Sequence, residues 1–206
     1  MDDQFGLFAL PPAPPRALAR PRVVSDARRH DLFLATRATA ADAARIRAQA
    51  AGEDRRLDVG GKLMDAGRLH VSLFELGSYT TVFPQQDVER WMQAADLVRV
   101  APFEVCFDRL ATFGGLSHPL VLRSSRQDGV AGLLRLRDAL GKALADMGKV
   151  VKDKPVEPHM TVSWEGVKID EAPTPELRWT PVEFVLIDSH VGKHIHEVLA
   201  SWPLRA

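Results

Sequence analysis

Two segments of the chain carry a histidine and a hydroxyl residue at a spacing that suits chemistry. Apolar and polar residues alternate around His70 and Ser72, which is typical of a strand with one buried face, so these two side chains share the opposite face. The same alternation places His159 and Thr161 together. A hydrogen-bonded histidine at a sheet surface would explain either segment alone, but two copies indicate a shared function.

The chemistry that these residues permit is general acid–base catalysis. An imidazole has an ordinary pKa of about 6.5, so at neutral pH one histidine can accept a proton while another donates one. Hydroxyl groups beside them can donate hydrogen bonds to oxygens on which negative charge builds. We therefore expect the two segments to face each other across a cleft.

The elements that must position these segments alternate between strand-like and helical patterns. Residues 165–181 are polar and are predicted to form a loop, and Gly60-Gly61 is predicted to form a turn rather than a phosphate-binding loop. We predict strands at residues 30–35, 69–76, 103–110, 119–123, 158–164, 182–189 and 194–200, and helices at 39–51, 86–98 and 129–147.

Strands and helices thus occur in two similar passes, and each pass contains one histidine strand. This order predicts an α+β fold with two pseudo-symmetric lobes, mainly antiparallel sheets and flanking helices. The active-site cleft is expected between the two lobes.

The composition is that of an ordinary soluble protein, with 46% hydrophobic and 26% charged residues among 206. Lys plus Arg and Asp plus Glu both number 27, which argues against binding long nucleic acids but permits a local basic cleft for one phosphate. Cys106 is the only cysteine, which favours a reducing compartment, and no apolar run is long enough to span a membrane. We expect a cytoplasmic monomer without a membrane partner.

The first part of the chain differs from the rest. Four prolines between residues 11 and 15, and the acidic start at Asp2 and Asp3, argue against a signal peptide and favour polyproline II or disorder. We therefore predict a proline-rich extension at residues 1–28 and one folded domain at residues 29–206.

The domain resembles the two-histidine (2H) phosphoesterases, and within them the 2′-5′ RNA ligase, or RNA 2′,3′-cyclic phosphodiesterase, family. The block His70–Gly77 is similar to the family's His-x-Thr-Leu-x-Phe-Leu-Gly block. Residues 103–115 are similar to its strand and turn between the motifs, and Asp188-Ser189 followed by residues 197–204 to its C-terminal block. The resemblance covers about residues 29–206.

Three positions depart from the family pattern. Ser72 replaces the usual threonine and keeps the hydroxyl group. Glu75 stands where the family often has phenylalanine, and Trp164 where it often has an arginine that could hold phosphate. The last two changes affect the expected specificity for RNA ends and leave the acid–base pair intact.

The resemblance implies metal-independent hydrolysis of 2′,3′-cyclic phosphates at RNA ends. It assigns His159 as the base that activates water and His70 as the acid that protonates the 3′ oxygen, which yields a 2′-phosphate. Ser72 and Thr161 would hold the phosphate oxygens. In the reverse direction the same pair would form a 2′-5′ linkage, and neither direction requires a cofactor.

Three other residues are candidates for substrate binding. Arg123 ends a predicted strand and could bind phosphate, although a solvated surface arginine is an equal alternative. Phe74 is in phase with His70, so we expect it on the cleft side, where it could stack on a base. Trp164 is in phase with the core residues, but a twist at the end of its strand would let it stack a base instead.

Alternatives to this interpretation concern metals and substrates. His190, His194 and His196 could suggest a metal site, but the sequence positions no carboxylate beside them, and we predict none. A small cyclic nucleotide is an alternative substrate, mildly favoured by the near-zero net charge. A binding module for RNA ends or nucleotides without turnover is a further alternative, although a pure binder needs no acid–base pair.

Overall fold

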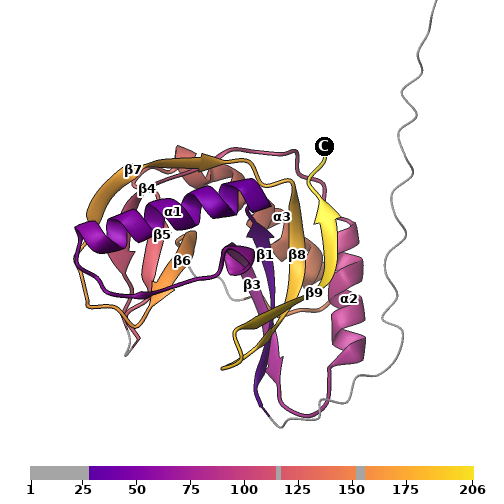
Figure 1. The fold of residues 1–206 in the computed structure, drawn as a ribbon. Helices are drawn as coiled ribbons and strands as arrows, with labels where there is room; N and C mark the ends of the chain where they lie inside the picture. Colours follow the sequence, from indigo (N-terminus) through magenta and orange to yellow (C-terminus); the bar gives the residue numbers. More distant parts are fainter. Residues whose placement is uncertain (1–27, 115–116, 152–155) are drawn as a thin grey trace, which may run out of the picture.

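Two antiparallel sheets and three α-helices make up the computed structural model, which describes residues 28–114, 117–151 and 156–206. The predicted extension, residues 1–28, lies outside these residues except for its last position. The α+β class is confirmed, and Figure 1 shows the two sheets side by side.

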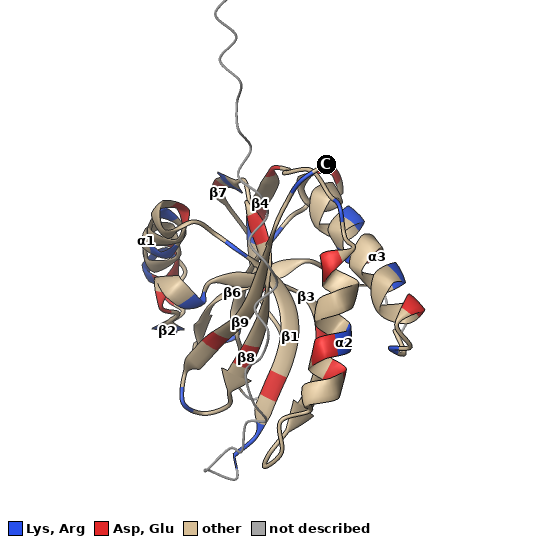
Figure 2. Cartoon of the chain, turned by 90° about the vertical axis from the view of Figure 1, so that its right-hand side faces the viewer, with Lys and Arg blue, Asp and Glu red and all other residues tan. Residues whose placement is uncertain are grey.

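The first sheet has the strand order β3-β1-β8-β9, and each neighbouring pair is antiparallel. Helices α2 and α3 pack against each other and against this sheet, on the side of the molecule opposite α1 (Figure 2). The elements of this lobe are β1 His30–Arg37, β3 His70–Tyr79, α2 Gln85–Asp96, α3 Ala131–Asp146, β8 Glu183–His190 and β9 Ile195–Pro203.

The second sheet has the order β2-β6-β5-β4-β7 and is also antiparallel. Helix α1 follows β1 in the chain but packs on this second sheet, where Nε2 of Gln49 donates to Oγ1 of Thr174 at 3.2 Å. The elements are α1 Ala40–Arg56, β2 Lys62–Leu63, β4 Val105–Thr112, β5 Leu120–Arg123, β6 His159–Trp164 and β7 Ala172–Trp179. Two short 3₁₀-helices, η1 Ala66–Arg68 and η2 Asp128–Val130, precede β3 and α3.

The two histidine strands meet where the sheets approach each other. β3 is an edge strand of the first sheet, β6 lies between β2 and β5 in the second, and β3 and β6 are in contact (Figure 1). The predicted arrangement of two lobes with a cleft between them is therefore confirmed.

The segment predicted as a loop at residues 165–181 contains a strand, β7. Its prolines, Pro173 and Pro175, lowered its strand signal because proline cannot donate a hydrogen bond to a neighbouring strand. β7 is the edge strand of its sheet and needs a partner on one side only, so both prolines are tolerated.

Helix α1 continues past the predicted stop at Gly52 and ends at Arg56. A glycine inside a helix costs only about 1 kcal/mol relative to alanine. The following turn is stabilised because Glu53 is buried and Nε of Arg56 donates to its carboxylate at 3.0 Å. The predicted N-cap is confirmed, since Oγ1 of Thr39 accepts from the backbone N–H of Asp42.

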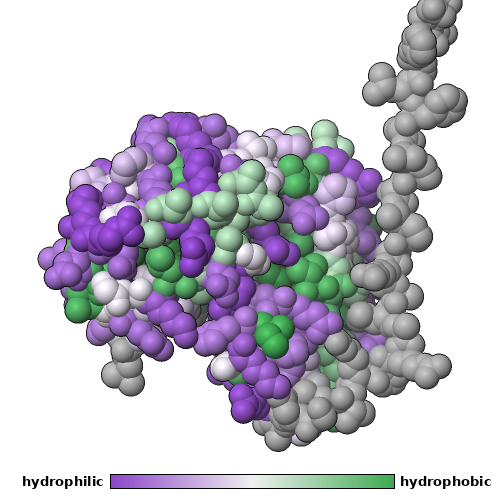
Figure 3. Space-filling view, in the orientation of Figure 1, coloured by the Kyte–Doolittle hydropathy of each residue, from purple (hydrophilic) through white to green (hydrophobic). Residues whose placement is uncertain are grey.

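The apolar faces of both sheets and all three helices join in one core, whose largest fully buried side chains include Phe107 and Phe184. The face seen in Figure 3 is mostly hydrophilic, with apolar residues in small groups, as is normal for a folded domain. Among the described residues, no helix is both long and apolar enough to cross a membrane.

Candidate active site

A cavity of about 860 Å³ lies between the two sheets. His70 and Ser72 line it from β3, and Thr161 and Trp164 line it from β6. Strand periodicity puts each histidine and its hydroxyl partner on one face, and the contact between β3 and β6 brings the two faces to the same cavity.

His70 is held in one orientation by its own backbone turn. Its Nδ1 donates to the carbonyl oxygen of Arg68 at 2.7 Å. A carbonyl can only accept, so Nδ1 carries the proton and Nε2 of the neutral ring is left with a lone pair. The ring packs at 5.1 Å, centroid to centroid, from both Phe33 and His196.

His159 is held in the same way on the other strand. Its Nδ1 donates to the carbonyl oxygen of Glu157 at 2.8 Å, which again leaves Nε2 open. Its ring stacks edge-on against Phe113 at 4.6 Å. His159 lies beside the cavity and not among its lining residues, and it is close enough to His70 for its charge to lower the pKa of that residue.

Burial lowers the pKa of His70 to about 4. The hydrogen bond to the carbonyl of Arg68 acts in the opposite direction, and the positive charges of Arg68, His159 and Arg37 add to the lowering. At neutral pH the free protein therefore holds His70 as a neutral imidazole that can accept a proton.

The family model for the 2′-5′ RNA ligase superfamily matches residues 35–193, which is more than half of the chain and includes both histidine strands. The chain belongs to the 2′-5′ RNA ligase superfamily. The resemblance inferred from the sequence is thereby confirmed. A comparison with curated protein sequences gave no match.

The fold of this chain is similar to that of several solved structures. It is similar to a crystal structure described as a phosphoesterase, with a TM-score of 0.64 and 22% identity over 88% of this chain and 100% of that one. It is also similar to E. coli LigT complexed with 3′-AMP, with a TM-score of 0.65 and 22% identity over 86% and 99%. TT0787 of Thermus thermophilus has a TM-score of 0.64 and 22% identity over 85% and 98%.

A bulge in β3 changes the phase of the strand after Ser72. Ser72 pairs with Ala35 of β1. Phe74 pairs with Leu34, the next residue of β1, so β3 contains one extra residue at Leu73. An extra residue reverses the faces of all the residues that follow it.

The predicted cleft-side position of Phe74 is therefore corrected. Its ring lies under the guanidinium of Arg137, 4.2 Å from ring centroid to Cζ. It also packs on α3, where a Cβ added at Gly141 would lie 3.0 Å from its ring. Glu75 takes the cavity-side position instead.

A second bulge, in β6, has the opposite effect on Trp164. Thr161 pairs with Val121 and Ser163 with Leu120, so the extra residue here is Val162. Trp164 thereby leaves the core side, lines the cavity and is 38% exposed. The core position favoured by the alternation is wrong. Trp164 has the cavity-side position that was considered as the alternative, and the bulge puts it there.

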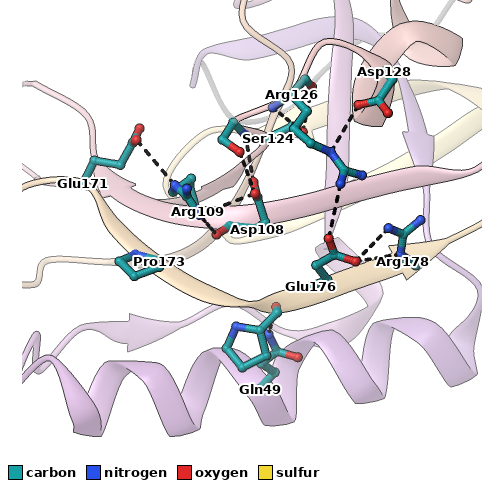
Figure 4. Close-up of polar contacts among 12 residues, drawn as sticks. Gln49, Asp108, Arg109, Ser124, Arg126, Asp128, Glu171, Pro173, Glu176 and Arg178 are labelled. Carbon is teal, nitrogen blue, oxygen red and sulfur yellow. Dashed lines mark hydrogen bonds and ion pairs between the residues drawn. The ribbon is translucent and has the colours of Figure 1, made fainter.

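Arg123 is not directed at the cavity. It pairs with His159 across β5 and β6, but its guanidinium forms ion pairs with Glu157 and, at 3.0 Å, with Glu171. Other arginines of this lobe are also bonded to carboxylates, as Figure 4 shows for Arg126 with Glu176. Phosphate binding by Arg123 would require breaking two ion pairs.

The structure adds cavity residues that the sequence did not single out for substrate binding, and Arg68 and His196 are two of them. Arg68 lies in η1, two residues before His70, and His196 lies on β9. His196 was considered only as part of a possible metal site with His190 and His194, so its place in the cavity was not predicted. Arg68 was not predicted because a single arginine forms no recognisable sequence motif.

The histidines near the C-terminus separate into two groups. His190 lies with His30 and Asp188, whose candidate ligand atoms are all within 4.8 Å of one another. Nδ1 of His30 lies 2.9 Å from Oδ1 of Asp188, and both residues are almost fully buried. This is the one group with metal-ligand spacing that the described residues contain, and it excludes His194 and His196.

Proposed function

We propose that this protein is a metal-independent phosphodiesterase that hydrolyses 2′,3′-cyclic phosphates at RNA ends to 2′-phosphates. The observation that carries the proposal is the matched geometry of His70 and His159. Each comes from a different sheet, donates through Nδ1 to the carbonyl two residues earlier, and leaves Nε2 open.

In-line attack on phosphorus needs a base on the side of the water and an acid on the side of the leaving oxygen. His159 and His70 supply these groups from the two sides of the cleft, with His159 as base and His70 as acid on the 3′ oxygen. Ser72 and Thr161 line the cavity beside them, and their hydroxyls donate to the non-bridging oxygens as charge builds there.

The lowered pKa of His70 bears on this division of roles. In the free protein His70 is mostly neutral at pH 7, so it can act as the acid only after the substrate's negative charge has raised its pKa. The neutral form favours a second assignment, with His70 as base and His159 as acid. In that assignment the substrate lies the other way round, with its 2′ oxygen at His159, and hydrolysis yields a 3′-phosphate. The product, and not the histidines themselves, distinguishes the two.

A small nucleotide carrying a cyclic phosphate is the second candidate substrate. The cavity volume of about 860 Å³ lies within the range of small-molecule sites, and Trp164 offers an aromatic face for one base. Structures of the similar LigT complexed with 3′-AMP, ATP and NADP⁺ support a nucleotide-sized ligand.

The test is product analysis with 2′,3′-cyclic AMP and with short RNAs that end in a 2′,3′-cyclic phosphate. We expect 2′-phosphates, identified by phosphorus NMR or by chromatography against 2′- and 3′-monophosphate standards. Release of 3′-phosphates would reverse the roles of His70 and His159. No hydrolysis of either substrate by the folded protein would favour a binding module.

The hydroxyl residues provide an internal check of the same mechanism. Ser72→Ala and Thr161→Ala should each lower kcat by roughly tenfold, the effect of losing one hydrogen bond to a charged group. Ser72→Thr is the matched control and should stay close to wild type, because the hydroxyl remains. If Ser72→Thr and Ser72→Ala lowered kcat equally, the Ser72 hydroxyl would have no role in the mechanism.

A further inference from the structure

A cationic group beside His70 lacks an acidic partner. The Arg68 side chain reaches the turn between β8 and β9 and the start of β9, where Nη1 lies 3.4 Å from Nδ1 of His194 and Nη2 lies 3.4 Å from Nε2 of His196. A guanidinium has donors only, so both imidazole nitrogens accept from it. In the described part of the chain no carboxylate forms an ion pair with Arg68, and Asp65 acts on it only by longer-range attraction.

Two donors of this cluster are buried and unused. Nε of Arg68 has no hydrogen-bond partner among the described residues, and neither has Nδ1 of His196, which carries the ring proton when Nε2 accepts. Buried donors are normally paired, because an unmade hydrogen bond costs about 1–3 kcal/mol. A cation with two unused donors beside it is the arrangement that an anion completes.

The cluster borders the reacting centre and is distinct from it. Arg68, His194 and His196 all line the cavity, and the His196 ring lies 5.1 Å from the His70 ring, centroid to centroid. Ser72 and Thr161 belong to β3 and β6, whereas the cluster is formed by η1, the β8–β9 turn and the start of β9. One ligand could therefore place one phosphate at His70 and another at Arg68.

His196 supports an anion in this position. Burial, followed by the charges of His70, Arg68 and Arg37, lowers its pKa to about 3, so its ring is neutral in the free protein and the charge of the cluster is that of Arg68. A bound anion would supply the counter-charge that Arg68 lacks. Arg29, the other arginine among the described lining residues, does not need one, since its Nε is already bonded to Asp31 at 2.7 Å.

We infer that Arg68, His194 and His196 bind a second phosphate of the substrate, so that the preferred substrate is a nucleoside 2′,3′-cyclic phosphate that also carries a 5′-phosphate group. This inference rests on the proposed reaction at His70 and adds the second charge that the substrate must carry. The 5′-phosphate can be the internucleotide ester of an RNA end or the phosphomonoester of a small nucleotide.

The experiment measures equilibrium binding, which needs no turnover. Adenosine 2′,5′-bisphosphate and adenosine 2′-monophosphate are titrated calorimetrically into the wild-type protein. We expect the bisphosphate to bind about tenfold more tightly or better, as one charge-assisted contact allows. Arg68→Gln should reduce this ratio to within about twofold of one. Equal affinity of the wild type for both ligands would overturn the inference.

Arg29→Gln is the matched control, because it removes the same charge from the same cavity at an arginine that is already ion-paired. It should keep the wild-type ratio. A ratio that survives in Arg68→Gln, or that falls equally in both variants, would contradict a subsite at Arg68. His196→Gln is a second variant that should lower the ratio, and circular dichroism confirms that each variant is folded.

Two further measurements separate the possible outcomes. The affinity of a dinucleotide that ends in a 2′-phosphate is compared with that of the bisphosphate, which shows whether the second phosphate is an internucleotide ester or a phosphomonoester. If either ligand binds more tightly than 2′-AMP, the inference is supported. Hydrolysis of 2′,3′-cyclic AMP is assayed independently. Absent hydrolysis with an intact bisphosphate preference would reject the proposed function alone, and hydrolysis without that preference would reject the subsite alone.

Discussion

The strands β3 and β6 carry the same histidine–hydroxyl motif in different electrostatic surroundings. Beside His70, Arg68 has no ion-pair partner among the carboxylates of the described residues. Beside His159, the neighbouring Arg123 is bonded to two carboxylates. The motif alone therefore does not determine the charge around each histidine, because neighbouring elements supply or cancel it.

The two sides also differ in the residue that follows the motif. The bulge in β3 turns Phe74 away from the cavity, whereas the bulge in β6 turns Trp164 into it. The β3 side thus offers Arg68, an arginine without an ion-pair partner among the described residues, together with the carboxylate of Glu75, and the β6 side offers an aromatic face. A nucleotide would accordingly direct its phosphates towards β3 and its base towards the end of β6.

The largest expected effect comes from removing either histidine. His70→Ala and His159→Ala should each lower kcat by about 10²-fold or more, because acid–base catalysis is typically worth about 10²–10⁴. Steady-state hydrolysis of 2′,3′-cyclic AMP measures this. His118→Asn is a matched control, since His118 lies at a turn with a φ of 37° that asparagine tolerates and does not line the cavity. Near-wild-type turnover in either alanine variant would show that the two sides are not an acid–base pair.

The aromatic residues should separate binding from stability. Trp164→Ala should weaken nucleotide binding about tenfold, since stacking on a base is worth about 1–3 kcal/mol, and should change the unfolding free energy little. Phe74→Ala should instead lower the unfolding free energy by roughly 2 kcal/mol and leave binding nearly unchanged. Calorimetric titration with 2′-AMP and urea unfolding measure both quantities. The opposite pattern would mean that the two bulges are misassigned.

The pH dependence should report the burial of His70 and the positive charges beside it. With a pKa of about 4 in the free protein, His70 should set the acidic limb of kcat/KM, which rises as the pH increases through about 4. A fall at higher pH is expected as well, because one histidine of the pair must keep its proton. Both assignments of acid and base give this same shape. Arg68→Gln removes one positive neighbour and should move the limb to higher pH, whereas Arg29→Gln should leave it in place. If the acidic limb of the wild-type profile lay near pH 6.5, the ordinary pKa of histidine, the lowered pKa of His70 would be contradicted.

The smallest effect is expected from metal removal. Activity should persist in excess EDTA, because the proposed proton transfers and charge stabilisation use side chains only. Loss of activity that zinc or manganese restores would instead implicate His30, Asp188 and His190, the described group with metal-ligand spacing. His190→Gln would then abolish the restoration.

Local geometry made the main parts of the site predictable. Successive side chains in a strand point to opposite faces, so the pairing of His70 with Ser72 and of His159 with Thr161 follows from their spacing. The same periodicity failed two residues beyond Ser72, at Phe74, and three residues beyond Thr161, at Trp164. A bulge is a mismatch between two paired strands, and neither strand's own sequence contains it.

The superfamily, the α+β class and the two histidine strands could be predicted from the sequence alone, because these depend on short-range periodicity and on motifs within single segments. Which charges are free depends instead on the three-dimensional fold. Arg68 meets His196, and Arg123 meets Glu171, only after distant strands have been brought together. Electrostatic interactions depend on distance in space and on burial, and neither quantity can be read from the separation of residues along the chain.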